Sequence, residues 1–504
     1  MKASKKTSEY VAIAVLIIAS SALILANLGN IYLWQDEAET ALLAKSTLSH
    51  GIPIAYDGRN YISQALGRDN GKDYVHLWHP WFPFYLLAGF FALFGTSTFV
   101  ARLPFALLGI STILLTYVYG KTLWRTRRAG VLAAVLLMSS VPFLLLVRQC
   151  RYYAPSAFFS LAGLYAYSEM LAKRRYASVG FVIAAVLLFN THYVYCAALI
   201  ASVVIHALIF RRAMLKSVLL SSAITIAVNV PGIIWFSGMW GVLNDYGGVR
   251  KLAITSAEFY VSQIGKHIFH PALLLLPVLL YVIGRIRPSC RVVWDRGTAG
   301  NVLLLMIFSI LTLVGISVTN KYPFFRYLAP LIPIMCLLAA LILEQGMRIH
   351  PGIAVAIILV LAWRGSMGGY LYEITHDYNG PIEGTILYLN ANASPGDVVA
   401  VTHEDLPVKW YTNLRVIGAV TGEDFAPALN ADWLVMRQTV DDQDYPFINF
   451  LMENIPWDKY EQIALPYPDI CFENREDPEE HHFRTVENPR SPVVIYRRTD
   501  PTIR

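Results

Sequence analysis

The sequence predicts an α-helical polytopic membrane protein with about 11 transmembrane helices, interfacial helices in the first external loop and a small C-terminal extracytoplasmic α/β domain. Of the 504 residues, 56% are hydrophobic and only 15% are charged, whereas soluble domains contain roughly 25% charged residues. Apolar runs long enough to span a bilayer recur along the chain. Lys and Arg gather in the short segments between these runs, as the positive-inside rule expects.

The charges divide the chain into two parts. Residues 1–367 carry 31 Lys and Arg against 12 Asp and Glu, a formal charge of +19, whereas residues 368–504 carry 10 against 23, a charge of −13. We therefore predict a transmembrane domain over 1–367 and a soluble domain over 368–504. The basic excess lies in short loops, so it does not indicate a nucleic-acid partner.

Eleven spans of about 20 residues can be placed. The first follows three lysines and lacks a small-residue cleavage site, so it is interpreted as an uncleaved span rather than a signal peptide. The predicted spans cover residues 10–30, 101–122, 129–147, 154–172, 177–189, 193–210, 217–236, 267–284, 299–318, 326–344 and 351–367.

A cytoplasmic N-terminus places the basic clusters near 121–128, 173–175, 211–216 and 285–296 on the inside. The apolar run 81–94 is short, and counting it as a span would invert this arrangement, so we predict an interfacial helix there. Residues 31–100 then form one large external loop. The odd number of spans places the C-terminal domain outside a plasma (inner) membrane.

The C-terminal part has the pattern of a small α/β domain. Strand-like apolar segments and two helical segments alternate in it. The predicted strands cover 398–401, 415–417, 433–436 and 493–496, and the predicted helices cover 381–391 and 445–454. The charged run His403-Glu404-Asp405 is interpreted as a solvated loop.

Polar residues that interrupt apolar sequence gather at the predicted outer face. Carboxylates and fixed cations at a membrane surface suit a reaction in which a hydroxyl is deprotonated while a lipid-held phosphate gains negative charge. These residues are Asp36, Glu37, Glu39, His79, Arg148, Arg151, Tyr152, Tyr153, His192, Lys321 and Arg326.

Several short motifs occur in a fixed order along the same part of the chain. They are Asp36-Glu37, His79-Pro80-Trp81-Phe82-Pro83-Phe84-Tyr85, Leu93-Phe94-Gly95, Ala101-Arg102-Leu103-Pro104, Arg148-Gln149-Cys150-Arg151-Tyr152-Tyr153-Ala154 and Phe325-Arg326-Tyr327-Leu328-Ala329-Pro330-Leu331-Ile332-Pro333. In these motifs the chain resembles the polyprenyl-phosphate-sugar-dependent glycosyltransferases of type C fold, including protein O-mannosyltransferase-like and lipid A aminoarabinose transferase-like enzymes.

The resemblance implies an inverting glycosyltransferase that moves a sugar from a polyprenyl-phosphate donor to a glycolipid, cell-surface glycan or protein acceptor. Asp36 would be the base, with Glu37 beside it as a second catalytic candidate. The donor would be bound by cationic and aromatic side chains. The implied binding residues are His79, Arg148, Arg151, Tyr152, Tyr153, His192, Lys321 and Arg326.

Two departures from the family pattern bear on the branch. Some relatives carry Asp where this chain has Tyr153, and aminoarabinose transferase-like members often have Lys near the position of His79. Tyr153 leaves the site without a possible additional carboxylate. His79 weakens the assignment to the aminoarabinose branch, so the sequence does not identify the acceptor.

Structural interpretations of the same residues compete with these roles. Asp36-x-x-Glu39 fits a capping box that opens a helix toward Ser49, in which Glu37 would orient neighbouring groups. Arginines at span ends, such as Arg148 and Arg151, also extend to lipid headgroups. His76 and His79 lack a nearby Cys or third His, so hydrogen bonding or packing is their expected role, and the need for a divalent cation is left open.

Two other functions are compatible with many spans and scattered charges. A transporter or flippase of lipid-linked sugars would place polar groups near mid-membrane and often shows paired repeats, whereas here the polar groups crowd one face and no repeat is visible. A receptor-like assembly factor would leave Asp36 dispensable. The C-terminal domain is expected to help build the acceptor side of the site.

Overall fold

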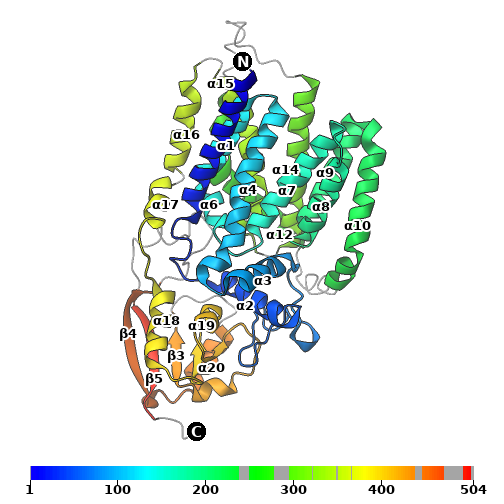
Figure 1. Cartoon of the computed structure of the whole chain (residues 1–504). Helices are drawn as coiled ribbons and strands as arrows, with labels where there is room; N and C mark the ends of the chain where they lie inside the picture. The colour runs from blue at the N-terminus through cyan, green and yellow to red at the C-terminus, as the bar shows by residue number, and fades with distance from the viewer. Residues whose placement is uncertain are drawn as a thin grey trace. The chain divides into compact units, whose positions relative to one another are not determined.

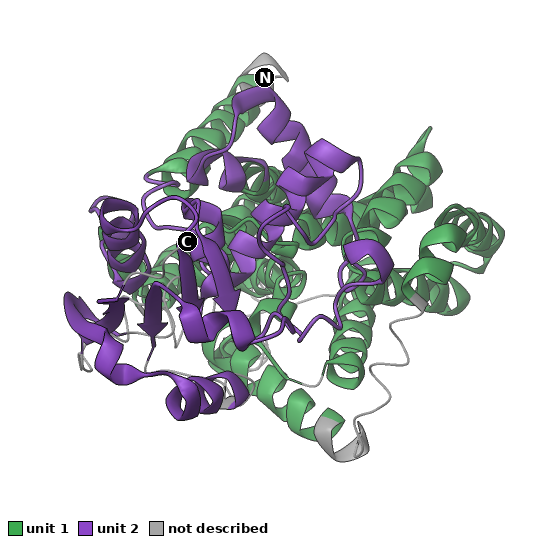
Figure 2. Ribbon diagram, turned by 90° about the horizontal axis from the view of Figure 1, so that it is seen from below, with its two compact units in different colours: residues 1–26, 105–372, 476–478 green, residues 27–104, 373–475, 479–504 purple. Residues whose placement is uncertain are grey.

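The computed structural model describes residues 2–237, 249–276, 295–320, 322–347, 350–364, 366–437, 445–469 and 492–500. These residues form two compact units, coloured separately in Figure 2. Unit 1 contains residues 1–26 and 105–372, and unit 2 joins residues 27–104 with the described residues from 373 onwards. The predicted boundary between 367 and 368 remains a prediction.

Unit 1 is helical. Helices α7, α8 and α9 pack against one another, and α9 also packs against α14 (Figure 1). Its elements are α1 (Lys2–Leu25), most of α4 (Thr98–Trp124), α5 (Arg127–Met138), α6 (Val141–Val147), α7 (Tyr153–Leu171), α8 (Ala177–Phe189), α9 (Tyr193–Phe210), η2 (Arg212–Met214), α10 (Leu215–Ser237), α12 (Val249–Gln263), η3 (Ile264–Ile268), η4 (Pro271–Leu274), α14 (Arg296–Thr319), η6 (Phe325–Leu328), α15 (Leu331–Gly346), α16 (Gly352–Arg364) and α17 (Met367–Glu373).

Several of these helices are long and apolar enough to cross a membrane. Within the described ranges there are five, and up to seven if each of two bent helix pairs is one span. One pair, α5 and α6, lies where a single span was predicted and bends by 70°. The bend follows from Pro142 in the first turn of α6, because proline has no amide hydrogen to continue a helix.

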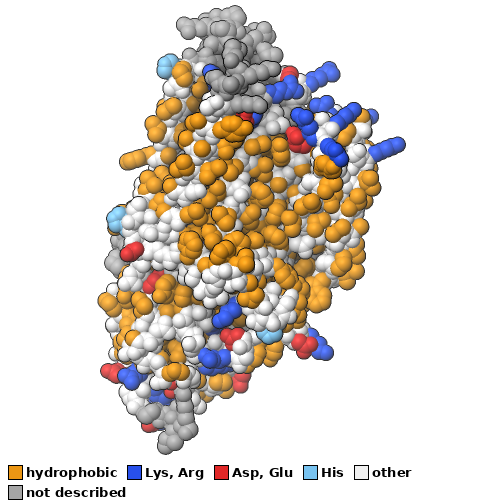
Figure 3. Space-filling view, viewed as in Figure 1, with side chains coloured by type: hydrophobic (Ala, Val, Ile, Leu, Met, Phe, Trp, Pro, Cys, Tyr) orange, Lys and Arg blue, Asp and Glu red, His pale blue; other side chains and the backbone are white. Residues whose placement is uncertain are grey.

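The surface of unit 1 fits a bilayer. Ile18, Leu220 and Ile234 expose 70%, 64% and 68% of their surface, which would be costly in water but suits lipid. Figure 3 shows hydrophobic side chains over the helices, with one group of Lys and Arg side chains at the upper right of the view and others among Asp and Glu near the bottom. The chain is a multi-pass membrane protein; the count of about eleven spans remains a prediction, and much of the predicted span 267–284 lies outside the described residues.

Unit 2 contains a five-stranded sheet with strand order β2-β1-β3-β5-β4. Strands β1, β2 and β3 are parallel, and β5 pairs antiparallel with both β3 and β4. Its elements are α2 (Gln35–His50), η1 (Lys72–Tyr74), α3 (Phe82–Phe94), α18 (Pro381–Asn392), β1 (Val398–Val401), α19 (Asp405–Tyr411), β2 (Arg415–Gly418), η7 (Ala426–Asn430), β3 (Trp433–Met436), α20 (Tyr445–Asn454), η8 (Trp457–Lys459), β4 (Tyr460–Pro468) and β5 (Pro492–Arg498).

The core of unit 2 has one layer on each face of the sheet. Val399 and Val401 of β1 pack with α18, whereas Ala400 between them packs with Phe447 and the rest of the second layer. This alternation follows from the two-residue period of a strand. The first layer also contains Trp34, from the loop after α1, which is 3% exposed. The predicted first external loop and the C-terminal part therefore share one core.

Candidate active site

Asp36 lies in the first turn of α2 and is 7% exposed. A carboxylate there is stabilised by the positive end of the helix dipole. The helix begins at Gln35, Trp34 occupies the N-cap position, and no side chain caps the first turn. The alternative interpretation, in which Asp36 is the N-cap of a capping box, is therefore wrong.

Glu37, the second predicted catalytic residue, forms a buried ion pair with Arg102. Arg102 donates from Nε to Oε1 (2.9 Å) and from a terminal nitrogen to Oε2 (2.6 Å). The side chains are 0% and 5% exposed. Such a two-point pair fixes both partners in one geometry. It fits the orienting role that the sequence analysis allows for Glu37.

Arg102 also shapes the backbone that leads into α2. Its terminal nitrogens donate to the carbonyls of Leu28 (3.0 Å), Ile31 (2.7 Å) and Tyr32 (3.2 Å). Arg102 lies in one of the motifs named above but was not predicted as a site residue. The signal was an arginine near the start of an apolar helix that was predicted to begin on the external side, where the positive-inside rule makes arginine scarce.

Residues before Asp36 are held by the C-terminal part of unit 2. Gln35 donates from Nε2 to Asp405 Oδ1 (2.9 Å) and accepts from the Leu406 amide (3.1 Å). The Tyr32 amide donates to Glu383 (2.7 Å). Burial raises the pKa of Glu383 above its ordinary value, while this bond works in the opposite direction. Helix α2 therefore starts from a backbone fixed by residues 351 to 371 positions away in sequence.

The prediction that His403-Glu404-Asp405 is a solvated loop is wrong. Glu404 and Asp405 are 5% and 1% exposed. Asp405 pairs with Lys409 at 2.6 Å, and Glu404 pairs with Arg437 at 2.7 Å. These carboxylates are buried because each has a cationic partner, which a charge pattern along the sequence does not reveal.

Replacing Gln35 with alanine is expected to destabilise unit 2 by about 1–3 kcal/mol, because the buried partners on Asp405 and Leu406 lose their hydrogen bonds. We also expect transfer activity to fall, since α2 carries Asp36. Thermal unfolding of the detergent-solubilised protein measures the first effect. Gln462→Ala, on an exposed position of β4, is the matched control. Equal melting temperatures for Gln35→Ala and Gln462→Ala would show that the hydrogen bonds of Gln35 do not stabilise unit 2.

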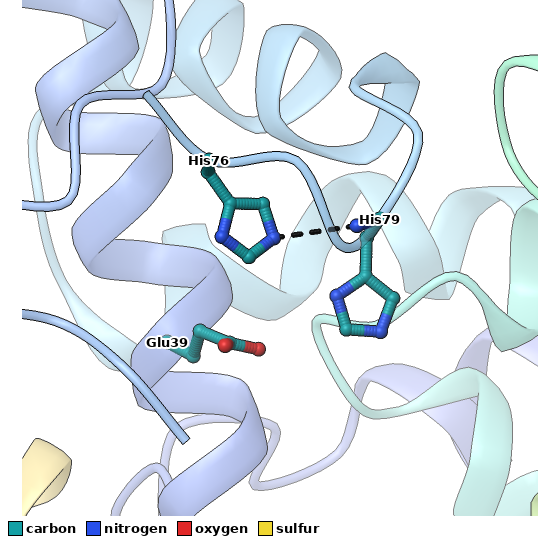
Figure 4. Close-up of side chains that lie close together, drawn as sticks. All are labelled: Glu39, His76 and His79. Carbon is teal, nitrogen blue, oxygen red and sulfur yellow. Dashed lines mark hydrogen bonds between the residues drawn. The ribbon is translucent and has the colours of Figure 1, made fainter. Parts of the chain in front are cut away.

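His79 lies with two other polar side chains of unit 2. Glu39 is on α2, and His76 and His79 are in the segment that precedes α3 (Figure 4). One donor atom from each residue lies within 4.8 Å of the others. No Cys or third His lies beside the two histidines in sequence, and the third side chain of the group is a carboxylate from a helix 37 residues before His76.

The other predicted binding residues that the structure describes are in unit 1. Tyr152 contacts Tyr153 and His192, with ring centroids 4.8 Å and 5.3 Å apart. His192 stacks on Tyr195 at 4.1 Å, and the Tyr195 hydroxyl donates to the Tyr327 carbonyl at 2.9 Å. The motif around 152 and the start of α9 thus meet the motif around 326 in one aromatic cluster.

The predicted cations of unit 1 differ in their surroundings. Arg148 donates to the carbonyls of Ile24 and Ala26, both at 2.8 Å, and so binds the C-terminal end of α1. Arg151 is 5% exposed and lies over the Tyr152 ring at 5.7 Å. Arg326 is half-buried, 4.0 Å from the Phe324 ring centroid. Lys321 lies outside the described residues.

Comparisons with known proteins agree with the resemblance drawn from the sequence. The sequence profile of the dolichyl-phosphate-mannose-protein mannosyltransferase family matches residues 78–235. No curated protein matches the chain in sequence. ArnT from Cupriavidus metallidurans bound to undecaprenyl phosphate aligns with 96% of this chain and 97% of its own, at 14% identity and a TM-score of 0.57.

An oligosaccharyltransferase from Archaeoglobus fulgidus, tethered with an acceptor peptide that contains the NVT sequon, aligns with 92% of this chain and 70% of its own. The identity is 13% and the TM-score is 0.52. The chain has the fold of these transferases. The profile match runs from residue 78, just before His79, into α10, and it contains Arg102, Arg148, Arg151 and His192.

Proposed function

We propose that the protein is an integral-membrane inverting glycosyltransferase, which moves a sugar from a polyprenyl-phosphate donor to an acceptor on the extracytoplasmic face. The observation that carries the proposal is the buried carboxylate of Asp36 at the start of α2, in a chain that shares its fold with ArnT. That relative was solved with undecaprenyl phosphate, which supports a lipid phosphate as the leaving group here.

The reaction needs one proton transfer and one displacement. Asp36 removes the proton from an acceptor hydroxyl or amine, and the acceptor atom attacks the anomeric carbon from the side opposite the lipid phosphate. The bond between that carbon and the phosphate oxygen breaks, and polyprenyl phosphate leaves with the bonding electron pair. The configuration at the anomeric carbon inverts, and no covalent enzyme intermediate forms.

The arginines that fit the phosphate best are Arg151 and Arg326. Both lie over aromatic rings, 5.7 Å and 4.0 Å from the ring centroids, and the planar guanidinium of arginine matches the geometry of a phosphate. Arg148 is assigned mainly to the end of α1, on the contacts described above. Tyr152 and His192 supply ring surface beside these cations, as sugar and prenyl groups require.

Replacing Arg326 with alanine is expected to raise the KM for the donor about 10- to 100-fold, because a charge-assisted hydrogen bond to phosphate contributes about 1.5–3 kcal/mol. Arg326→Lys should recover part of the affinity, since lysine keeps the charge but loses the planar fork. Initial rates against donor concentration measure this. The exposed Arg174→Ala is the control, and equal KM values for the two alanine variants would exclude Arg326 from donor binding.

The acceptor is a glycolipid, a cell-surface glycan or a protein. The C-terminal part of unit 2 supports the acceptor side in this proposal, because it fixes the segment that carries Asp36. The N-terminus lies in the cytoplasm and the C-terminal domain outside, in a plasma (inner) membrane. This orientation is supported by the positive-inside rule.

The proposal is tested by incubating the reconstituted protein with a panel of polyprenyl-phosphate sugars and native membrane acceptors. We expect one donor class to release free polyprenyl phosphate, and the transferred sugar to have the opposite anomeric configuration. Retained configuration would exclude the single displacement. If no donor in the panel releases polyprenyl phosphate, the proposal that the protein is a glycosyltransferase is wrong.

A further inference from the structure

Three side chains that the proposed reaction does not use lie together in unit 2. Glu39 and His76 are 2% and 1% exposed, and His79 is half-buried. Figure 4 shows the two imidazoles and the carboxylate around a common centre, with Glu39 on α2 and both histidines on the segment before α3. Carboxylate and imidazole together are a recurring ligand set for zinc and similar cations.

The first histidine is held in one tautomer. His76 Nδ1 lies 3.2 Å from Asn70 Oδ1. The Asn70 amide nitrogen donates to the carbonyl of Ile62 (2.9 Å) and to Asp69 (3.2 Å), so its oxygen faces the imidazole as an acceptor. His76 Nδ1 therefore carries the proton, and Nε2 presents its lone pair. This is the outer-shell arrangement that metal-ligating histidines usually have.

The segment that carries the histidines is also fixed. The Trp81 indole donates to the His76 carbonyl at 2.9 Å, and Phe84 of α3 packs edge-on against the His76 ring at 5.5 Å. The His79 amide points to His76 Nε2 at 3.4 Å, a long contact that a cation would replace. The two imidazole rings are nearly parallel, 5.7 Å apart.

The spacing suits a small cation. Ligand bonds of about 2.0–2.2 Å in a tetrahedral site put donor atoms roughly 3.4 Å apart. The three donors lie within 4.8 Å of one another, so side-chain rotations that move the donor atoms by about an ångström would bring them to this separation. Calcium and magnesium prefer oxygen ligands, so two imidazoles favour zinc or a neighbouring transition metal.

We infer that Glu39, His76 and His79 bind one divalent transition-metal ion, with zinc as the first candidate. Three protein ligands leave a fourth position for water or a substrate oxygen. The ion ties α2 to the segment before α3. Glu39 is three residues after Asp36, on the same helical face, so the ion also fixes the helix turn that presents the proposed base.

The test measures metal rather than sugar transfer, so its failure is distinct from failure of the proposed function. Full-length protein, freed of any histidine tag and stripped with a chelator, is titrated with Zn²⁺, and bound metal is counted by mass spectrometry. We expect one equivalent to bind and to raise the melting temperature. Added Co²⁺ should give the visible absorption of a four-coordinate site.

Variants assign the ligands. Glu39→Gln and His79→Ala should each weaken Zn²⁺ binding more than Asn70→Ala, for which loss of an outer-shell partner predicts about a 10- to 100-fold effect. His50→Ala, an exposed histidine at the end of α2, is the matched control and should bind like wild type. Binding of less than one equivalent by wild type, or equal affinity in wild type and both ligand variants, would overturn the inference.

Discussion

Replacing Asp36 with asparagine is expected to reduce sugar transfer by about 10²- to 10⁴-fold, the usual contribution of a positioned general base. Asparagine has nearly the same shape but does not accept a proton at neutral pH. Donor binding should stay close to wild type, because the phosphate is assigned to arginines of unit 1. Single-turnover rates with saturating donor, at equal amounts of folded protein, measure the effect.

The control for this substitution is Asp73→Asn, which makes the same chemical change at an exposed position of unit 2. Asp73 has a φ of 58°, a conformation that asparagine adopts readily, so its fold should be unchanged. Full activity of Asp73→Asn with loss in Asp36→Asn supports the assignment. Comparable rates for the two variants would mean that another group removes the proton.

Replacing Arg102 with alanine is expected to cost about 3–5 kcal/mol of stability, because it leaves the carboxylate of Glu37 buried without its cation. The carbonyls of Leu28, Ile31 and Tyr32 lose their donor at the same time. Thermal unfolding at a fixed scan rate measures the loss. Activity should fall as well, since this backbone leads into α2.

Two further variants separate charge from shape at this pair. The double substitution Glu37→Met with Arg102→Met removes both charges and should be more stable than Arg102→Ala. Arg125→Ala breaks an exposed pair with Asp295 and should change stability much less than Arg102→Ala does. A loss for Arg102→Ala as small as that for Arg125→Ala would show that the buried pair does not hold the segment.

Local patterns predicted the elements of unit 2 well. The predicted strands at 398–401 and 433–436 are β1 and β3, and the predicted helix at 445–454 is α20. These segments have strong alternation or helical spacing, which acts over a few residues. Strand β4 was missed because Pro466 and Pro468 lie in it, and proline argues against a strand that must donate along its length.

Long-range pairing could not be predicted. Trp34 looked like the start of an external loop, yet its side chain belongs to the core of the sheet. Glu39 and His76 are far apart in sequence, so their approach depends on how the segment between them folds. The burial of Glu404 likewise could not be predicted, because its partner Arg437 lies 33 residues later in the sequence. Contacts between residues distant in sequence depend on the tertiary structure, and they cannot be predicted from the periodicity of apolar residues.

Whether the sugar leaves its lipid is the measurement that tests the central claim most directly. A donor labelled on both the sugar and the polyprenyl chain is placed in sealed proteoliposomes with acceptor, and the two labels are followed separately. Our account predicts that the sugar label passes to the acceptor while an equal amount of labelled polyprenyl phosphate remains in the membrane. If both labels stay together and cross to the opposite leaflet, the protein is a transporter of lipid-linked sugars and the transferase proposal is wrong.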